Sequence, residues 1–388
     1  MQIFIFSSQK WAGSTFFLLA SYALVLATSV GVETQGTVPI PSSSAGGKVA
    51  DPAYQGFGAK TPGGSGKAIV RVANLNDSGP GSFRDAVSQG SRTVVFDVAG
   101  EIVLTKTVYI RGAFITVDGF TAPAPGITLK NYGLSISGNR GAHDIIVRGM
   151  RVRDAGITGD KEQTDGMNVV KGAYNVVIDH VSIHGSEDGN LDIGTDSRDV
   201  TVSWSILAEP RATQKNMLIK YNPSRISLHH NIFVHAQQRN PQVAIDNTGT
   251  AATDTTLDMR NNLVWDWAGG YGTLIWSGAR ANVVNNFYSS PRSFPKNQKQ
   301  ALVVGAMQGS GEKLAAMARV YTSGNYSADK LEQDINKVGN EKSPFPASPV
   351  DTQDACTAAR AVLAGTGVRP LDAIDQKYLS AISLPVCP

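Results

Sequence analysis

Short apolar segments recur along the middle of the chain, and each is rich in β-branched residues. The segments are IIVRGMRV (145–152), VVIDHVSI (176–183), VTVSWSIL (200–207), ISLHHNIF (226–233), LDMRNNLV (257–264) and VVNNFYS (283–289). They align at Gly149, His180, Trp204, His230, Asn261 and Asn285, which are 31, 24, 26, 31 and 24 residues apart. Runs of this kind predict short strands, and a repeat of about 20–50 residues predicts a solenoid.

No helical segment separates these strands, so a TIM barrel or a Rossmann fold is disfavoured, because their parallel strands require helical crossovers. A parallel β-helix coil of three short strands takes about 22–30 residues. We therefore predict an all-β, right-handed parallel β-helix, in which the variable separations place extra residues in loops on one face. Asn231, the pair 261–262 and the pair 285–286 predict a ladder of side-chain amides at the turns.

The two ends of the repeat carry segments of a different kind. The sequence SGPGSFRDAV predicts a turn that runs into a short capping helix at 85–88, over the open core of the first coil. Residues 354–383 carry two helix-like stretches, and such a helical tail packs along a solenoid or covers its last coil. Two cysteines, Cys356 and Cys387, lie in this tail, and we favour a structural disulfide between them over free thiols.

The N-terminal region has the pattern of a targeting segment. An apolar run at 16–27 follows Lys10 and precedes small residues, which predicts a signal peptide over 1–29 and a secreted protein, extracellular or periplasmic. The competing interpretation is an uncleaved anchor at the short limit for a spanning helix. We expect a Pro/Ser/Gly linker over 30–48 and a single domain over 49–388 that includes the tail, with no stable membrane insertion.

Composition narrows the function classes. The chain has 388 residues, 40 of them Gly, with 17% charged residues and a formal net charge of +3. A nucleic-acid binder normally carries a concentrated basic excess, so we do not expect nucleic acid as a partner. Frequent Gly disfavours long helices and favours many short strands with turns.

Three carboxylates form the first candidate site. Asp188 and Asp192 are four residues apart and would face the same side of an extended strand, and Asp165 precedes Asp188 by 23 residues, close to one coil. Carboxylates gathered on one surface repel each other unless a cation lies between them, and a hard, oxygen-preferring ion such as Ca²⁺ suits them. The alternative is that they are solvated turn residues, and the spacing alone does not decide between the two.

Two cations continue this series along the coils. Lys215 follows Asp192 by 23 residues and Arg239 follows Lys215 by 24, so stacking would place all of these charges along one groove. Cations beside a calcium site suit an acidic polymer whose carboxylates bridge metal and protein. Taken singly, each of the two is more simply explained as a solvated surface charge.

The segment 165–243 resembles the pectate lyase family of polysaccharide lyases, which are built on a right-handed β-helix. The matching motifs are NVVIDHVSI (175–183), DGNLDI (188–193), KNMLI (215–219) and HHNIFVHAQQRNPQV (229–243). The segments at 56–87 and 94–104 also resemble the opening of secreted lyase-like proteins of this group. The resemblance implies that Asp165, Asp188 and Asp192 are Ca²⁺ ligands, that Lys215 holds a substrate carboxylate, and that Arg239 is the base that removes the C5 proton of a uronate.

The chain also departs from the family pattern. The family often has a second Arg five residues beyond the catalytic one, where this chain has Ala244, and Gln242 stands where a basic residue is common. Substrate contacts are therefore altered, and Arg211 is a candidate substrate-binding residue that would compensate.

The resemblance implies a secreted, Ca²⁺-dependent lyase that cleaves pectate or polygalacturonate by β-elimination, acting as a monomer on an acidic polysaccharide. One alternative is a polygalacturonase-like hydrolase on the same fold, which would need paired carboxylic acids and bases. The other is a β-helical carbohydrate-binding protein that lacks the chemistry. The presence of both Lys215 and Arg239 beside the aspartates argues against the second alternative.

Overall fold

The computed structural model describes residues 53–156, 164–245, 251–291, 300–305, 316–328 and 334–387. These residues belong to one compact unit, Pro41–Pro388. The signal peptide expected over 1–29 and the linker expected over 30–48 lie outside the described residues, and the domain boundary at 49 stays a prediction. In the described part, none of the helices has the length and apolar character needed to cross a membrane.

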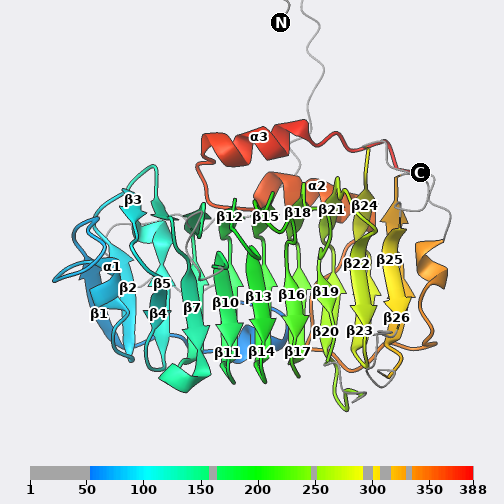
Figure 1. Cartoon of the computed structure of the whole chain (residues 1–388), viewed down its shortest axis with the longest axis horizontal. Coiled ribbons are helices and arrows are strands. Elements are labelled where there is room, and N and C mark those ends of the chain that lie inside the picture. The colour runs from blue at the N-terminus through cyan, green and yellow to red at the C-terminus, as the bar shows by residue number, and fades with distance from the viewer. Residues whose placement is uncertain are drawn as a thin grey trace, which may run out of the picture. The chain divides into compact units, whose positions relative to one another are not determined.

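Three parallel sheets run the length of the unit, and the chain visits them in turn (Figure 1). Sheet A contains β1 (Ala68–Val72), β2 (Arg92–Phe96), β5 (Ile115–Asp118), β8 (His143–Arg148), β11 (Tyr174–Asp179), β14 (Arg198–Ser203), β17 (Ser224–His229), β20 (Leu257–Arg260), β23 (Arg280–Val284) and β26 (Arg319–Ser323). Sheet B contains β3 (Gly100–Val103), β6 (Ile127–Lys130), β9 (Met150–Arg153), β12 (Ser182–His184), β15 (Ile206–Ala208), β18 (Ile232–Val234), β21 (Leu263–Trp265), β24 (Phe287–Ser289) and β27 (Tyr326–Ser327). Sheet C contains β4 (Val108–Ile110), β7 (Leu134–Ser137), β10 (Met167–Val170), β13 (Leu191–Gly194), β16 (Leu218–Lys220), β19 (Gln242–Val243), β22 (Tyr271–Trp276) and β25 (Gln300–Gly305). The predicted right-handed parallel β-helix is confirmed.

Each repeating segment of the sequence is two strands rather than one. The segment at 176–183, for example, contains the end of β11, a turn at His180, and the start of β12. All six residues at which the segments align have positive φ angles, between 47° and 67°. The chain therefore bends from sheet A to sheet B at the aligned position in these six coils, and five of the six residues there are Gly, His or Asn, with Trp204 as the exception.

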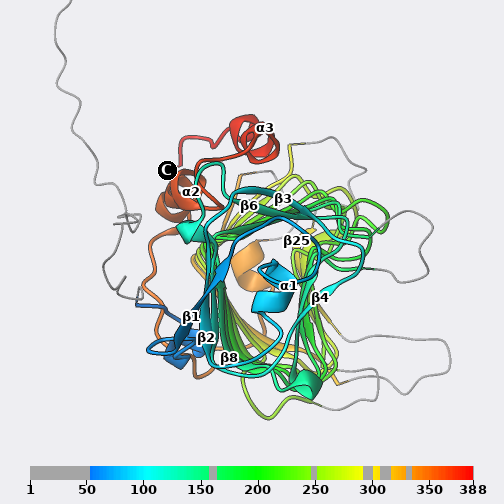
Figure 2. The ribbon, with the colours of Figure 1, turned by 90° about the vertical axis from the view of Figure 1, so that its left-hand side faces the viewer.

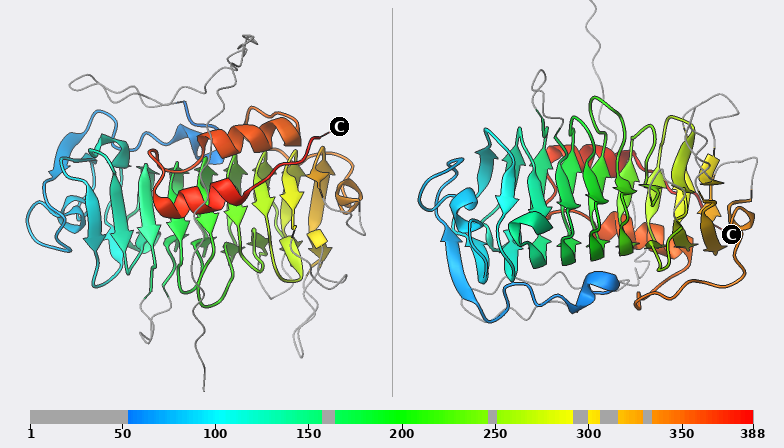
Figure 3. Two further views of the ribbon diagram at one scale, coloured as in Figure 1. Left: turned by 90° about the horizontal axis from the view of Figure 1, so that it is seen from above. Right: turned by 60° about the horizontal axis from the view of Figure 1, so that its bottom comes forward.

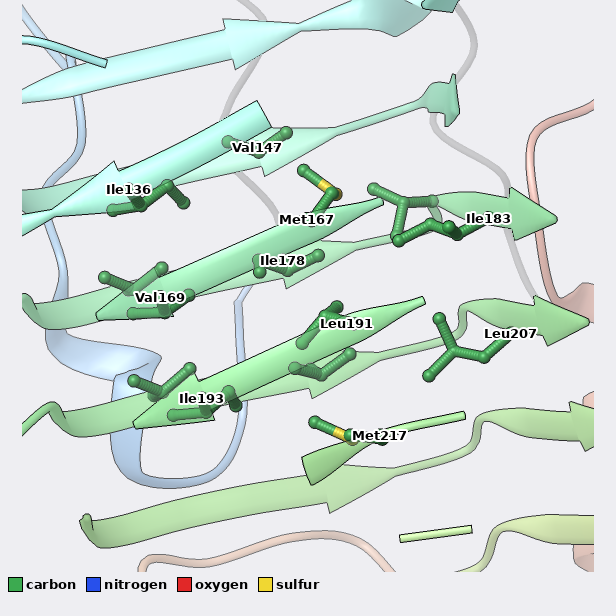
Figure 4. Packing of buried hydrophobic residues seen from close by; sticks show 14 of the residues in the cluster. Ile136, Val147, Met167, Val169, Ile178, Ile183, Leu191, Ile193, Leu207 and Met217 are labelled. Carbon is green, nitrogen blue, oxygen red and sulfur yellow. The ribbon is translucent and has the colours of Figure 1, made fainter. Parts of the chain in front are cut away.

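Apolar side chains from all three sheets fill the interior of the coils. Figure 4 shows Met167, Val169, Leu191 and Ile193 of sheet C packed among side chains of the other two sheets, such as Ile178. All five are at most 1% exposed. Because the core is continuous through the stack, the sheets form a rigid support for residues on their outer faces.

The predicted amide ladder stands at the bend between sheets A and B. Asn231 donates through Nδ2 to Oδ1 of Asn262 at 3.0 Å, and Asn262 donates in the same way to Asn286 at 2.9 Å. The ladder continues to Asn325 at 3.1 Å. The structural role assigned to these asparagines is confirmed.

The N-terminal end of the coil is closed by a short helix, α1 (Phe83–Ala86), which Figure 2 shows inside the ring of strands. It begins two residues before the expected range because Ser82 caps it, accepting a hydrogen bond from the backbone N–H of Asp85 at 3.2 Å. Phe83 is fully buried. The described ranges also contain the 3₁₀ turns η1 (Phe57–Lys60), η2 (Gly119–Thr121), η3 (Gly138–Arg140) and η5 (Ile335–Lys337).

The C-terminal tail forms two helices, α2 (Ala355–Gly365) and α3 (Ala373–Ala381), which lie along the stack (Figure 3). Helix α2 packs against β21 and β24 of sheet B. Helix α3 is anchored by Asp375, whose carboxylate accepts hydrogen bonds from Arg153 and Ser182. Cys356 and Cys387 form the expected disulfide, with an S–S distance of 1.98 Å.

Candidate active site

Five residues of consecutive coils form one row at the turns that lead from sheet B into sheet C. Met167 of β10 pairs with Leu191 of β13, so Asp165 and Gly189, each two residues before the paired residue of its own strand, lie level with each other. Ile193 pairs with Ile219, and the same offset places Lys215 level with Gly189 on the next coil. The pairings of Leu218 with Gln242 and of Gln242 with Leu274 bring Arg239 and Tyr271 to the same turns, and Lys215 itself bridges Gln238, the residue before Arg239. The complete row, called the site row below, is Asp165, Gly189, Lys215, Arg239 and Tyr271.

A second amide ladder lies directly beneath this row. Asn190 donates through Nδ2 to Oδ1 of Asn216 at 2.9 Å, and Asn216 donates to Oδ1 of Asn240 at 3.0 Å. Each of these asparagines is at most 1% exposed and immediately follows a member of the site row. The ladder therefore fixes the backbone that carries Gly189, Lys215 and Arg239.

The three aspartates occupy different local structures. Asp192 lies within β13, and its Oδ1 accepts a hydrogen bond from the backbone N–H of Leu218 at 2.8 Å. Asp188 lies in the turn before β13, not in the extended strand that its spacing from Asp192 suggested. Asp165 precedes β10 and accepts hydrogen bonds from the Gly189 N–H at 3.2 Å and from the Asn168 amide at 3.3 Å.

These carboxylates affect one another electrostatically. Burial, followed by the negative charge of Asp188, raises the pKa of Asp165 to about 6, while its two hydrogen bonds and the charge of Arg239 act in the opposite direction. Burial, followed by the charge of Asp165, raises the pKa of Asp192 well above its usual value, and Arg239 again opposes this shift. A cation is therefore the species that this surface would stabilise most.

The aspartates suit a calcium ion in donor type and direction. A Cβ atom at Gly189 would lie 2.7 Å from Oδ1 of Asp192 and 3.3 Å from Oδ1 of Asp165, so both carboxylates converge over this glycine. All-oxygen donors are what Ca²⁺ prefers, and the Cys/His donors of zinc sites are missing from this surface as far as the structure describes it. Across the described ranges no three His, Cys, Asp or Glu side chains form a ready metal-binding group. A bound ion would thus need further oxygens or a closer approach of the carboxylates.

Arg239 is the cation most closely coupled to the aspartates. Its charge lowers the pKa values of Asp165 and Asp192, in opposition to the effect of burial. Its backbone is in the left-handed region, with φ at 64°, which is unfavourable for a residue with a long side chain. Its Nε atom is buried and has no hydrogen-bond partner among the residues that the structure describes.

Tyr271, the last member of the site row, was not identified from the sequence. Its hydroxyl donates to Oε1 of Gln242 at 2.7 Å. Burial raises its pKa to about 12, against the effect of the Arg239 charge. Ala244, where the family often has a second Arg, is fully buried in this chain, so the neighbouring coil supplies a tyrosine beside Arg239 instead.

Arg211 does not belong to the site row. It donates to the backbone carbonyl of Gly156 and lies 3.8 Å from Oε2 of Glu187. It lines a separate cavity, on whose walls none of the predicted aspartates, Lys215 or Arg239 is found.

The sequence contained a signal for this arrangement that the spacing argument did not use. Asn190, Asn216 and Asn240 each follow a site-row residue at nearly one coil's distance, in the dipeptides Gly-Asn, Lys-Asn and Arg-Asn. Buried asparagines at coil spacing indicate a ladder, as Asn231 and its partners do on the other bend. The spacing of these three asparagines in the sequence therefore also predicts that Lys215 and Arg239 lie at corresponding turns of neighbouring coils.

Comparison with known proteins gives both sequence relatives and structural neighbours. No family model matches the chain. A probable pectate lyase C of Aspergillus oryzae is 36% identical over 245 residues, which are 62% of this chain and 54% of the relative, and a probable pectate lyase 6 of Arabidopsis thaliana is 31% identical over 172 residues, 39% of this chain and 36% of the relative. The chain thus spans about half the length of the Aspergillus relative.

Solved structures show the same fold at low sequence identity. The cedar pollen allergen jun a 1 aligns with a TM-score of 0.62 at 17% identity, covering 81% of this chain and 93% of the allergen. A pectate lyase of Bacillus sp. N165, in complex with trigalacturonate, aligns with a TM-score of 0.58 at 16% identity, covering 81% of this chain and 98% of that enzyme. Over 62% of its length the chain is therefore similar in sequence to probable pectate lyases, and it shares the fold of a solved pectate lyase.

Proposed function

We propose that the protein is a Ca²⁺-dependent lyase that cleaves polygalacturonate, or a closely related polyuronate, by β-elimination. The observation that carries the proposal is the position of Arg239, held in the site row by the amide ladder and close enough to Asp165 and Asp192 to lower the pKa values of both. The sequence relatives are named as pectate lyases, and one solved neighbour binds trigalacturonate. An acidic polymer also suits a surface that combines carboxylates for a metal with two cations.

In this proposal Asp165, Asp188 and Asp192 hold Ca²⁺, which when bound would neutralise the substrate carboxylate and so acidify the proton on the adjacent C5. Lys215 binds the same class of carboxylate through its ammonium group. Both contributions stabilise the negative charge that develops as the C5 proton is lost.

Arg239 takes the C5 proton. The electrons of the C–H bond form the C4–C5 double bond, and the O4-linked sugar leaves with the electrons of its C4–O4 bond. An arginine is ordinarily protonated because its pKa exceeds about 12. The unprotonated form that a base requires is populated only as the pH rises, so we expect an alkaline pH optimum. A neutral or acid optimum would contradict Arg239 as the base.

The experiment that tests the activity follows the absorbance of unsaturated uronate with polygalacturonate as the substrate, with and without a chelator. Absorbance that the chelator removes supports the lyase. New reducing ends without absorbance would indicate a hydrolase, and neither product would indicate a protein that only binds carbohydrate.

The role of Arg239 has its own test. We expect Arg239→Lys to abolish turnover while Ca²⁺ binding, measured by calorimetry, is unchanged. Arg71→Lys is the matched control, because Arg71 is an exposed arginine paired with Asp97 on sheet A. Wild-type turnover in Arg239→Lys would remove this residue from the mechanism.

We also propose that the protein is secreted as a monomer. The disulfide between Cys356 and Cys387 supports export, since such bonds persist in oxidising compartments. N-terminal sequencing of protein recovered from the medium should find a new terminus near Ser29, and full-length protein retained in the membrane fraction would favour an anchor.

A further inference from the structure

A polar cavity lies beside helix α3, which contributes Lys377 to its lining. Its volume is about 560 Å³, within the usual range for small-ligand pockets of roughly 300–1,000 Å³. Its walls are formed by Asp154, His184, Gly185, Glu209, Pro210, Arg211, Gln214, His235, Gln237, Ala268 and Lys377.

One wall of the cavity is a row of turn residues fixed by the β-helix. His184 pairs with Ala208 and Ala208 with Val234, so Gly185, Glu209 and His235, each one residue further on, stack on successive coils. The backbone N–H of Glu209 donates to the carbonyl of Val234 at 3.0 Å, in the same coil-to-coil pattern. This wall therefore has the rigidity of the sheets and is largely preformed for a ligand.

The formal charges of the lining balance. Asp154 and Glu209 contribute two carboxylates, and Arg211 and Lys377 contribute two cations. The charges are also partly satisfied internally, since Lys377 Nζ lies 3.7 Å from Oε2 of Glu209. Burial and the charge of Arg153 lower the pKa of His184, so that this ring is neutral at pH 7. The cavity lining therefore has no net charge of either sign that would attract a charged ligand, in contrast to the site row.

Two glutamine amides supply uncommitted hydrogen-bonding groups. Gln214 and Gln237 are exposed and line the cavity, and within the described ranges no hydrogen bond to either side-chain amide is found. The backbone N–H of Gln237 donates to the carbonyl of Gln214 at 2.9 Å, which holds the two residues together on neighbouring coils. Each side-chain amide has hydrogen-bond donors and an acceptor, so it can bond to two adjacent sugar hydroxyls, accepting from one and donating to the other.

We propose that this cavity binds a neutral, hydroxyl-rich saccharide unit. Gln214 immediately precedes Lys215 and Gln237 lies two residues before Arg239, so the bound sugar would contact the same turns that carry the two cations of the site row. Only the further point, that the sugar belongs to the polymer being cleaved, rests on the proposed function. In that case the cavity binds uncharged sugar units that are attached to an acidic polysaccharide chain.

Saturation-transfer NMR with the full-length protein tests the proposal, using galactobiose as the neutral probe and digalacturonate as the acidic one. We expect galactobiose to bind, and the double variant Gln214→Ala/Gln237→Ala to weaken it at least tenfold. Gln376→Ala is the matched control, because Gln376 is an exposed glutamine of α3 outside the lining. Ala268→Trp, which fills the cavity, should abolish galactobiose binding, and thermal unfolding checks that each variant is folded.

Absence of galactobiose binding, or binding that neither the double variant nor Ala268→Trp affects, would overturn the proposal. A double variant that weakens digalacturonate while leaving galactobiose unchanged would show that the cavity takes acidic sugars, and this would overturn it as well. Binding is measured without turnover. A protein that binds galactobiose here but fails to cleave polygalacturonate contradicts the proposed function alone, and the reverse result contradicts only the cavity assignment.

Discussion

Replacing Gly189 by alanine perturbs the aspartates without removing any of them. The added Cβ would lie 2.7 Å from Oδ1 of Asp192, whereas ordinary contact begins at 3.4 Å, so about 0.7 Å of movement is required. The φ angle of Gly189 is outside the left-handed region, so the backbone itself accepts alanine. The strain therefore falls on the carboxylates of Asp192 and Asp165.

The size of the effect follows from what anchors Asp192. Its Oδ1 accepts the Leu218 N–H at 2.8 Å, and a displacement of 0.7 Å away from this donor exceeds the normal range of a hydrogen bond. A hydrogen bond to a charged group contributes about 1.5–3 kcal/mol. Because about 1.4 kcal/mol corresponds to a tenfold change in affinity, we expect the Kd for Ca²⁺ to rise at least tenfold in Gly189→Ala.

Calorimetric titration of Ca²⁺ into the protein measures this effect directly. Gly305→Ala is the control, since a Cβ at Gly305 meets nothing within 4 Å and its φ angle is also outside the left-handed region. Thermal unfolding in chelator shows whether Gly189→Ala is folded. A Ca²⁺ affinity equal to that of the control would refute the assignment of Asp165 and Asp192 as metal ligands.

Three further predictions concern other parts of the structure. Asn262→Ala should lower the free energy of unfolding by about 2–4 kcal/mol in a denaturant titration. It removes the acceptor of the buried Asn231 backbone N–H, one of the two hydrogen bonds of the Asn231 side-chain amide, and the amide that donates to the carbonyl of Leu228. Burial lowers the pKa of His229 to about 3, so the imidazole stays neutral in the native state, whereas the unfolded chain takes up the proton near pH 6.5. The free energy of unfolding is therefore at its full value above pH 6.5 and decreases as the pH is lowered. We expect a decrease of about 3 kcal/mol at pH 4. Tyr271→Phe removes the donor to Gln242 and should raise KM for polygalacturonate about tenfold, measured by initial rates.

Each of these has a specific control. Asn76→Ala changes an exposed asparagine, and an equal loss of stability in it and in Asn262→Ala would contradict the importance of the ladder. His229→Gln should flatten the acid side of the stability curve, and an unchanged slope would assign it to other groups. An unaltered KM in Tyr271→Phe would mean that neither the tyrosine nor Gln242 contributes to substrate contact.

The coil architecture could be predicted from the sequence because its signal is periodic, whereas the finer placement depends on register. Spacing predicted Lys215 and Arg239 on neighbouring coils, and the structure bridges Lys215 with Gln238, one residue before Arg239, while the strands that follow pair with a 24-residue offset. It placed Asp165 opposite Asp188, but the 24-residue offset between β10 and β13 puts it level with Gly189. Sequence spacing alone does not determine the register between neighbouring coils to within one residue.

Other features were missed for different reasons. Tyr271 lies 32 residues after Arg239, one residue beyond the longest separation of the aligned segments, and it carries no charge, so the series of charged residues did not extend to it. Arg211 has the right charge and a nearby position in the chain, but its turn carries it to the α3 side. Which side of a turn a side chain takes is decided by local hydrogen bonds, such as the one from Arg211 to Gly156, and a single sequence does not reveal these.

Because Asn190, Asn216 and Asn240 form a ladder, the alignment of successive coils does not depend on the length of the loops between them. Between successive strands of sheet C from β10 to β22, paired residues are 24, 26, 24 and 32 positions apart, yet the site row stays aligned. Lengthening a surface loop costs little free energy, and the buried amides keep their partners when a loop grows. The loops beside the site row can therefore be exchanged coil by coil during evolution or engineering, while the row itself keeps its geometry.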